Sequence, residues 1–342
     1  MEGHELSPLE LDESLEEIIR GVASPAQVAG FLVALRGKGE TADELAGFAA
    51  ALRRHSKRMH PVVSGRLVDT CGTGGDGAGI FNVSTVAAIV AAGAGVFVAK
   101  HGNRSVTGKS GSADLLESLG FNLAVEPSKV EESIEQVGIG FMFAPTFHPA
   151  MKQVGPVRKE LGIRTVFNLM GPLMNPAGAD YQLLGVYSSS LTSKVAHALL
   201  KLGTKEAMVV HGLEGMDEIS VTGRTQVSWL KGGEVTTREH APADFALEAA
   251  ATTPPRVSSP EESAGVVLDI LRGGKRKDGS IELVLVNAAA AIVLGGLAQS
   301  FAEAIPIAST SIESGAAFKK LEGMIKHSGG SLEKLENHAT TQ

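Results

Sequence analysis

Five glycines fall within the eight residues 72–79, around the acidic residue Asp76. They follow a short apolar segment, Leu67–Thr70, which is typical of a β-strand that runs into a loop. A single turn does not need so many glycines. Because glycine allows close backbone approach, such a loop presents N–H groups that can converge on an anion. We therefore interpret residues 72–79 as a phosphate-binding loop.

A second candidate anion site follows at Asn82–Thr85 (NVST). We predict that Ser84 caps a helix that continues through Ala94. A helix N-terminus offers unpaired N–H groups and the positive end of the helix dipole, both of which favour phosphate. The Ser84 hydroxyl could also reach a metal ion. Two explanations stay open here, a plain helix cap and a ligand site.

A basic segment, Lys100–Ser105 (KHGNRS), comes directly after the predicted strand Val96–Ala99. Ligands of open parallel sheets bind at the carboxyl ends of the strands. Lys100 and Arg104 supply positive charge there, in a chain whose net charge is −7. The segment 108–112 leads into another helix start and is a candidate second phosphate cradle.

Two common nucleotide-binding motifs fit this chain poorly. Residues 72–77 match the G-x-G-x-x-G pattern of dinucleotide-binding folds, but the predicted helix starts only near Ser84. The next strand also ends in a basic pair at 100–101, where such folds place an acidic residue. For a Walker A motif, Gly102 stands one residue too far from the segment 108–110 (GKS).

The composition is that of a folded protein from a reducing compartment. Hydrophobic residues make up 43% and charged residues 20% of the 342 residues, which excludes a disordered chain. The single cysteine, Cys71, forms no intramolecular disulfide, and the acidic N-terminus lacks the apolar core of a signal peptide, so we expect a cytoplasmic protein. The most apolar run, residues 283–298, falls short of the ~20 residues that span a bilayer and predicts a buried helix. The negative net charge disfavours a general nucleic-acid binder.

The pattern of predicted elements changes near Arg66. The first sixty residues predict helices only, with capping boxes at Ser24–Gln27 and Thr41–Glu44. Beyond Arg66, strands and helices alternate, which predicts an α/β fold with a mostly parallel central sheet flanked by helices on both faces. Further elements are expected as strands near 139–143, 182–187 and 206–210, a β-hairpin at 225–237, helices at about 260–272, 281–298 and 310–326, and a frayed polar tail from Ser328.

Taken together, these segments resemble the anthranilate phosphoribosyltransferase family over nearly the whole chain. The resemblance rests on the order and spacing of Gly72–Asp76 (GTGGD), Asn82–Thr85 (NVST), Lys100–Arg104 (KHGNR), Ser110–Asp114 (SGSAD), Gly162–Pro176 (GIRTVFNLMGPLMNP) and Asp217-Glu218. It implies an enzyme of tryptophan biosynthesis that transfers the phosphoribosyl group of 5-phosphoribosyl 1-pyrophosphate to anthranilate. The products would be N-(5-phosphoribosyl)anthranilate and pyrophosphate.

The resemblance also implies roles for the matching residues. Lys100, Asp217 and Glu218 would be catalytic, and Ser84 with the two acids would hold two Mg²⁺ ions per subunit. A hard cation suits few carboxylates together with waters and substrate oxygens. Without the resemblance, an acidic surface turn is the commoner explanation of residues 217–218. The donor would contact Gly72, Gly75, Asp76, Ile80, Asn82, Val83, Ser84, Thr85, Lys100, His101, Gly102, Asn103, Arg104, Ser105, Val106, Thr107, Gly108 and Ser112.

For the acceptor, the resemblance implies contacts of anthranilate with Gly72, Asn103 and Arg158. A guanidinium suits the anthranilate carboxylate because it donates forked hydrogen bonds. Arg164 is the competing arginine, and His101 is a candidate proton acceptor. The acceptor channel would be lined by Pro145, His148 and Met151.

The resemblance implies a small all-helical domain (1–67, joined by about 156–180), a large α/β domain (68–155 and 181–342) and a homodimer. Ile80 departs from the family, which usually has threonine or serine at this position. Two other functions stay open, a pyrimidine nucleoside phosphorylase-like enzyme of the same fold and a non-enzymatic, nucleic-acid-binding relative. The intact glycine, lysine and acid motifs argue against both, so the expected partners are small-molecule substrates, with no nucleic acid and no membrane.

Overall fold

The structure, a computed structural model, describes residues 3–105, 108–250 and 252–340. A sheet of seven strands in the order β3-β2-β1-β4-β5-β6-β7 forms the centre of the molecule. Strands β1 to β5 are parallel to one another, whereas β6 pairs antiparallel with both β5 and β7. This arrangement confirms the predicted mostly parallel sheet and the predicted hairpin. The strands are β1 (Leu67–Gly72), β2 (Phe97–Gly102), β3 (Ile139–Phe143), β4 (Tyr181–Gly185), β5 (Glu206–Gly212), β6 (Thr225–Lys231) and β7 (Glu234–His240).

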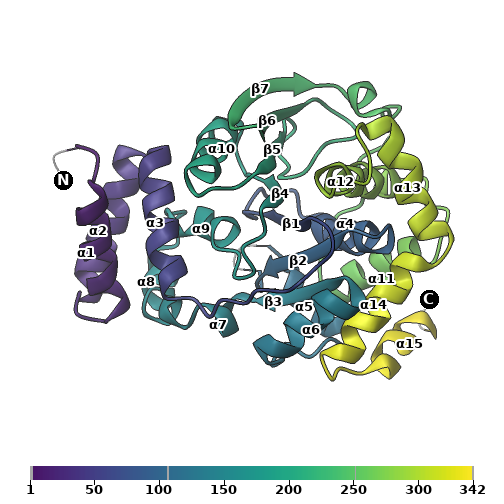
Figure 1. Ribbon diagram of the computed structural model, residues 1–342, viewed down its shortest axis with the longest axis horizontal. Helices are drawn as coiled ribbons and strands as arrows, with labels where there is room; N and C mark the ends of the chain where they lie inside the picture. The colour runs from purple at the N-terminus through teal and green to yellow at the C-terminus, as the bar shows by residue number, and fades with distance from the viewer. Residues whose placement is uncertain (1–2, 106–107, 251, 341–342) are drawn as a thin grey trace.

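Helices surround the sheet, and Figure 1 shows the first three standing apart from it on the left. The α-helices are α1 (Pro8–Ile19), α2 (Pro25–Lys38), α3 (Ala42–Arg54), α4 (Val83–Gly93), α5 (Ser112–Ser118), α6 (Pro127–Val137), α7 (Ala144–Phe147), α8 (Gly155–Leu161), α9 (Phe167–Leu173), α10 (Thr192–Lys201), α11 (Pro260–Leu271), α12 (Ser280–Leu294), α13 (Phe301–Glu313), α14 (Ala316–His327) and α15 (Leu332–Thr340). Short 3₁₀ helices are η1 (Pro149–Gln153), η2 (Ser189–Leu191) and η3 (Pro242–Phe245).

The sheet separates two hydrophobic cores because successive side chains of a strand point to opposite faces. In β4, Leu183 belongs to one core and its neighbour Leu184 to the other. In β5, Met208 and Val209 divide in the same way. Both faces of the sheet are therefore covered, as the alternation of predicted elements indicated.

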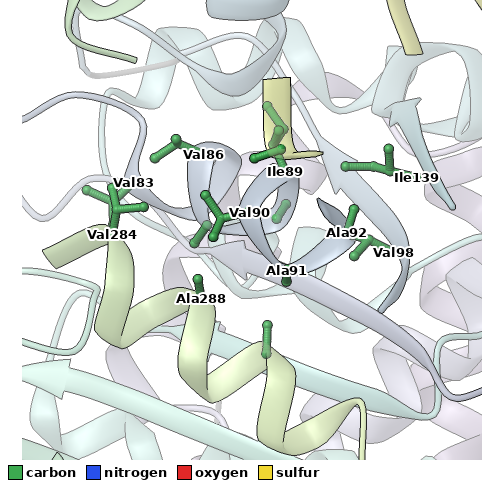
Figure 2. Close-up of a cluster of buried hydrophobic side chains, with 14 of the residues drawn as sticks. Val83, Val86, Ile89, Val90, Ala91, Ala92, Val98, Ile139, Val284 and Ala288 are labelled. Carbon is green, nitrogen blue, oxygen red and sulfur yellow. The ribbon is translucent and has the colours of Figure 1, made fainter. Parts of the chain in front are cut away.

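The first core is built around α4, whose side chains from Val83 to Ala92 are almost all buried. Figure 2 shows these side chains packed between β2 and β3 on one side and Val284 and Ala288 of α12 on the other. At the end of α4, glycine also lets α13 come close, since a Cβ on Gly93 would lie 2.2 Å from the Ser311 Oγ. The position of α4 is thereby fixed, together with the loop that leads into it.

The second core joins α1, α2 and α3 to the rest of the chain. Capping boxes at Ser7, Ser24 and Thr41 start these three helices, and the two predicted ones are confirmed. Their buried side chains pack with Val157 of α8 and Phe167 of α9. Residues far along the sequence thus complete the helical region on the left of Figure 1.

Three local predictions were wrong. Asn82, not Ser84, is the N-cap of α4, so Ser84 lies inside the first turn with its amide free to bond elsewhere. The helix expected at 310–326 is two helices, broken at Gly315, which has a φ of 73°. The tail forms helix α15 instead of fraying because the side chain of Leu335 is buried in the first core. In the described part of the chain, no helix is long and apolar enough to cross a membrane.

Candidate active site

The glycine-rich loop and the basic segment meet at the carboxyl edge of the sheet because β1 and β2 are parallel neighbours. Lys100, the fourth residue of β2, points into this edge and is buried. Its Nζ donates to the Thr70 carbonyl at 2.6 Å and to the Ser84 Oγ at 3.3 Å. The Lys100 ammonium therefore lies between the end of β1 and the first turn of α4.

Two acids from a distant part of the sequence reach the same point. The Glu218 Oε1 accepts from the Ser84 amide at 3.1 Å, and the Asp217 Oδ2 accepts from the Gly74 amide at 2.8 Å. Asn287, buried in α12, fixes the loop behind these acids because its side chain bonds both the amide and the carbonyl of Ile219. Residues 217–218 thus form no surface turn.

Burial dominates the electrostatics of this cluster. Burial and the nearby Asp76 carboxylate together raise the pKa of Asp217 to about 7. The pKa of Glu218 is raised by burial and by Asp217, while Lys100 lowers it. Burial also lowers the pKa of Lys100, and the charges of Asp69, Glu218 and Asp217 oppose that effect. The site concentrates more carboxylates than the single ammonium can neutralise.

This excess of acid fits a divalent cation shared with a substrate. Asp217 and Glu218 offer oxygen ligands, and the Ser84 hydroxyl lies beside Lys100. After burial, a neighbouring carboxylate is the largest cause of the raised pKa of each acid. Within residues 3–105, 108–250 and 252–340, no group of three or more His, Cys, Asp or Glu side chains forms a metal cage. Mg²⁺ commonly binds through one or two carboxylates, with waters and phosphate oxygens completing its shell.

Glycine is favoured in this loop for two reasons, a close contact at one position and the backbone conformation at the others. A Cβ on Gly72 would lie 2.5 Å from the Asp217 Oδ2. Gly74, Gly75, Gly77 and Gly79 all have φ between 63° and 78°, a region that favours glycine. On its outer side the loop is held by Arg164, whose guanidinium donates to the Gly75 carbonyl. The loop therefore presents its backbone, not side chains, to the edge of the sheet.

The segment after β2 forms a second cradle. The Ser112 Oγ and the Ala113 amide both donate to the Asn103 carbonyl, at 3.3 Å and 3.2 Å. Gly102 is required here, because a Cβ would lie 2.2 Å from the Ser112 Oγ. A Cβ on Gly108 would lie 3.0 Å from the Ser105 Oγ, so the described end of this loop folds back on its start.

Arg104 is held by its own loop. Its guanidinium donates to Asp114 at 2.9 Å and to Glu117 at 2.7 Å. The Asp114 carboxylate also accepts from the amides of Ser105 and Gly111. Arg104 is thus placed with the other predicted donor residues, but two acids already share its charge.

Four further predicted donor residues lie around the start of α4. The Asn82 side chain bonds Ser110 and Ser263, which ties the glycine loop to the second cradle and to α11. The side chain of Val83 is buried in the core, and its amide donates to the Phe81 carbonyl at 2.8 Å. The hydroxyl of Thr85 is buried without a hydrogen-bond partner among the described residues. Ile80 forms an antiparallel bridge with Arg256. The predicted donor residues Val106 and Thr107 lie outside the described residues.

Two buried histidines lie side by side next to Lys100. The rings of His101 and His148 meet edge to face, 4.9 Å apart. The His101 Nδ1 donates to the Gly171 carbonyl at 2.9 Å, so its Nε2 is the unprotonated nitrogen. Neither Nε2 has a hydrogen-bond partner among the described residues. Burial lowers the pKa to about 4 for His101 and to about 3 for His148.

Arg158 lies on α8, away from the contacts just described. Its guanidinium sits over the Phe167 ring, 5.6 Å from the ring centre, and burial lowers its pKa. In the described part of the chain no carboxylate pairs with it, and no hydrogen bond joins it to Lys100, Asp217 or Glu218. The structure leaves this cation free to bind an anion, but does not bring it into direct contact with the acids.

The sequence analysis missed Asp69. This acid is completely buried in β1, where its Oδ1 accepts from the His101 amide at 3.2 Å and its Oδ2 accepts from Gln182 at 3.3 Å. Its pKa is raised by burial and lowered by Lys100. A charged residue inside an otherwise apolar strand is a signal that the sequence does contain.

Comparison with known proteins identifies the family of this chain. Residues 64–318 match the family described as "Glycosyl transferase family, a/b domain", and residues 1–56 match its "helical bundle domain". Anthranilate phosphoribosyltransferase from Methanocorpusculum labreanum is 51% identical over 95% of both chains. The chain belongs to the anthranilate phosphoribosyltransferase family. Another member, from Nitrosomonas europaea, is 47% identical over 96% of both chains.

Solved structures of this family have the same fold. The anthranilate phosphoribosyltransferase of Thermus thermophilus superposes with a TM-score of 0.87, at 40% identity, over 96% of this chain and 97% of that one. The enzyme from Saccharomyces cerevisiae, solved in complex with PRPP and Mg, gives a TM-score of 0.84 at 32% identity, over 95% and 94% of the two chains. The predicted family and fold class are confirmed.

Proposed function

We propose that this chain transfers the phosphoribosyl group of 5-phosphoribosyl 1-pyrophosphate (PRPP) to the amine of anthranilate, forming N-(5-phosphoribosyl)anthranilate and pyrophosphate. The observation that carries the proposal is the convergence of Lys100, Ser84 and Glu218 beside the glycine-rich loop. These groups come from three separate segments, and together they suit a metal-bound diphosphate. Every one of the 47–51% identical relatives described above is an anthranilate phosphoribosyltransferase.

Backbone amides of the glycine loop bind the anionic donor. They suit polyanions because successive N–H groups of a glycine-rich loop can converge on one anion. Lys100 donates to the pyrophosphate as negative charge grows on it during departure. Because Lys100 is buried, its ammonium stabilises this charge more strongly than it would in water.

Ser84, Asp217 and Glu218 hold Mg²⁺, two ions per subunit. When bound, Mg²⁺ supplies positive charge that neutralises the pyrophosphate and stabilises it as a leaving group. The protein positions its own ligands through the amides of Ser84 and Gly74, which fix the two carboxylates. Catalysis then consists mainly of holding donor and acceptor in line and of stabilising charge.

Arg158 and Asn103 position anthranilate, and Arg158 binds its carboxylate. The neutral aromatic amine attacks C1 of the ribose from the face opposite the departing pyrophosphate. After the C1–N bond has formed, His101 accepts the proton that the nitrogen releases, because its Nε2 is unprotonated and its Nδ1 is held by Gly171. A weak base is sufficient here, since a protonated aromatic amine is strongly acidic.

The domain organisation and the oligomeric state that we propose are those implied by the resemblance to the family. The helical region 1–67 and the segment 156–180 form a small domain, residues 68–155 and 181–342 form the large domain, and the cleft between them closes over the substrates. Two chains form a homodimer through their small domains, in the cytoplasm.

The direct test is the fluorescence of anthranilate, which should fall when the protein is mixed with PRPP and Mg²⁺. Without Mg²⁺, or with ribose 5-phosphate in place of PRPP, the fluorescence should stay constant. Phosphorolysis of a pyrimidine nucleoside in place of this transfer would contradict the proposal. So would a DNA or RNA mobility shift in moderate salt with no turnover.

A further inference from the structure

Arg164 makes contacts that the sequence analysis did not anticipate. It lies in the exposed segment between α8 and α9, yet its guanidinium donates to the Gly75 carbonyl of the glycine loop. The same guanidinium stacks on the Tyr187 ring, 4.4 Å from the ring centre. A planar guanidinium can stack and donate in its own plane at the same time, which a lysine ammonium cannot do.

Tyr187 also contacts the glycine loop directly. Its backbone amide donates to the Thr73 Oγ1 at 3.1 Å, and the Thr73 amide donates to the Gly185 carbonyl at 2.9 Å. The ring is half-buried, and the charges of Arg36 and Glu40, near the end of α2, act on its hydroxyl. Tyr187 therefore lies between the glycine loop, the segment that carries Arg164, and the helical region.

The loop needs such support. Four of its glycines have positive φ, and glycine loses more conformational freedom on ordering than any other residue. On the inner side, Asp217 holds the Gly74 amide. On the outer side, Arg164 holds the carbonyl of the next residue, Gly75. The two contacts fix the peptide groups on either side of the Gly74–Gly75 bond.

We propose that Arg164 and Tyr187 form a latch that holds residues 73–75 in the shape that binds the donor. Arg164 is thus a positioning residue for PRPP and not a ligand of the anthranilate carboxylate. Because the latch joins the loop to the segment between α8 and α9 and to α2, binding of the donor becomes coupled to the placement of the helical region. Pre-ordering the loop improves donor affinity by removing an entropic cost of binding.

Steady-state kinetics distinguishes the roles of Arg164 and Arg158. This experiment rests on the proposed function. Arg164→Ala should raise KM for PRPP about tenfold and leave KM for anthranilate within about twofold. Arg158→Ala should show the reverse pattern. Tyr187→Leu should resemble Arg164→Ala, whereas Tyr187→Phe, which keeps the ring and the amide, should resemble the wild type. Lys159→Ala, which removes an exposed cation nearby, is the matched control and should have no effect. A selective rise in KM for anthranilate in Arg164→Ala would overturn the proposal.

Hydrogen exchange tests the latch without any turnover. In the ligand-free protein, amides in a peptide covering residues 72–80 should exchange several-fold faster in Arg164→Ala and Tyr187→Leu than in the wild type or Lys159→Ala. Peptides from α4 and α12 should be unchanged, which excludes general unfolding. Equal exchange in the loop of all four proteins would refute the latch. If the wild type shows no transfer but the loop exchange changes as expected, the proposed function fails and the latch stands.

Discussion

Burial sets the chemistry of the acids at the level of single residues. Asp217 has a pKa raised to about 7, so in the metal-free protein at pH 8 its charge is present but opposed by burial and by Asp76. A bound cation would stabilise the charged carboxylate. Replacing the carboxylate by a neutral amide would remove the unfavourable charge altogether. The same side chain should therefore be essential for activity and unfavourable for stability.

Asp217→Asn should lower kcat/KM at least about 100-fold at every Mg²⁺ concentration, because a ligand to the cation is lost. The variant should also have a higher Tm than the wild type at pH 8 without metal. A raised carboxyl pKa lowers stability as pH rises from 3.8 to about 7, so this Tm advantage should vanish near pH 4. Asp180→Asn, in a surface pair with Lys205, is the control and should change neither quantity much. Normal turnover in Asp217→Asn would exclude the metal role.

The histidine pair predicts a second pH effect, with the opposite sign. In the unfolded chain a histidine takes up a proton near pH 6.5, whereas burial keeps His148 neutral in the folded protein down to about pH 3. Each such histidine lowers stability by up to about 1.4 kcal/mol for every unit that the pH falls below 6.5. His148→Gln should flatten the dependence of unfolding free energy on pH between 6.5 and 4.5. Urea denaturation at several pH values would measure it, and an unchanged slope would contradict the assignment.

Recognisable local motifs pointed to the glycines, Ser84 and Lys100, and the structure brings these residues to one edge of the sheet. The sequence could not predict which of them touch, since Glu218 reaches the Ser84 amide across 134 positions of the chain. Tyr187 escaped notice for the same reason, because its importance lies in contacts with distant segments. Asp69 did carry a local signal, as a charged residue inside an otherwise apolar strand, but its partners His101 and Gln182 are distant in sequence.

At the level of elements, the close approach of β1 to the loop carrying Asp217 makes Gly72 indispensable. Gly72→Ala should place a methyl group 2.5 Å from the Asp217 Oδ2 and displace that carboxylate. We expect activity to fall at least about 100-fold while the fold is kept, because a single acid side chain can move aside. Gly155→Ala is the matched control, since nothing lies within 4 Å of its Cβ and its φ is not positive. Circular dichroism and turnover, measured on both variants, would check this, and an active Gly72→Ala would contradict it.

Element boundaries followed from capping and periodicity wherever a local signal existed, as at Ser24 and Thr41. The predicted boundaries were wrong where tertiary packing determines where a helix begins or ends. A single helical pattern covers residues 310–326, yet the chain turns at Gly315 so that both α13 and α14 can pack on α4. Likewise, α15 is helical because Leu335 finds a place in the core, which the polarity of the tail concealed.

At the scale of the whole molecule, the helical region leaves apolar side chains uncovered. Leu9 in α1 is 65% exposed and Val33 in α2 is 46% exposed, and these helices form the outermost layer on the left of Figure 1. A second copy of the chain would bury such a surface, and each unit of apolar area removed from water stabilises the pair. This is the surface through which we expect the homodimer to form.

Light scattering on a sizing column should therefore give twice the 35.4 kDa of one chain for the wild type. Leu9→Glu and Val33→Glu should each shift the mass toward a single chain, because a desolvated carboxylate at the contact is costly. Lys100, Asp217 and Glu218 all come from one chain, so the monomeric variants should keep kcat within a few-fold. Glu13→Gln, elsewhere on α1, should stay dimeric as the control. A monomeric wild type, or dimers that persist in both glutamate variants, would place the contact elsewhere or remove it.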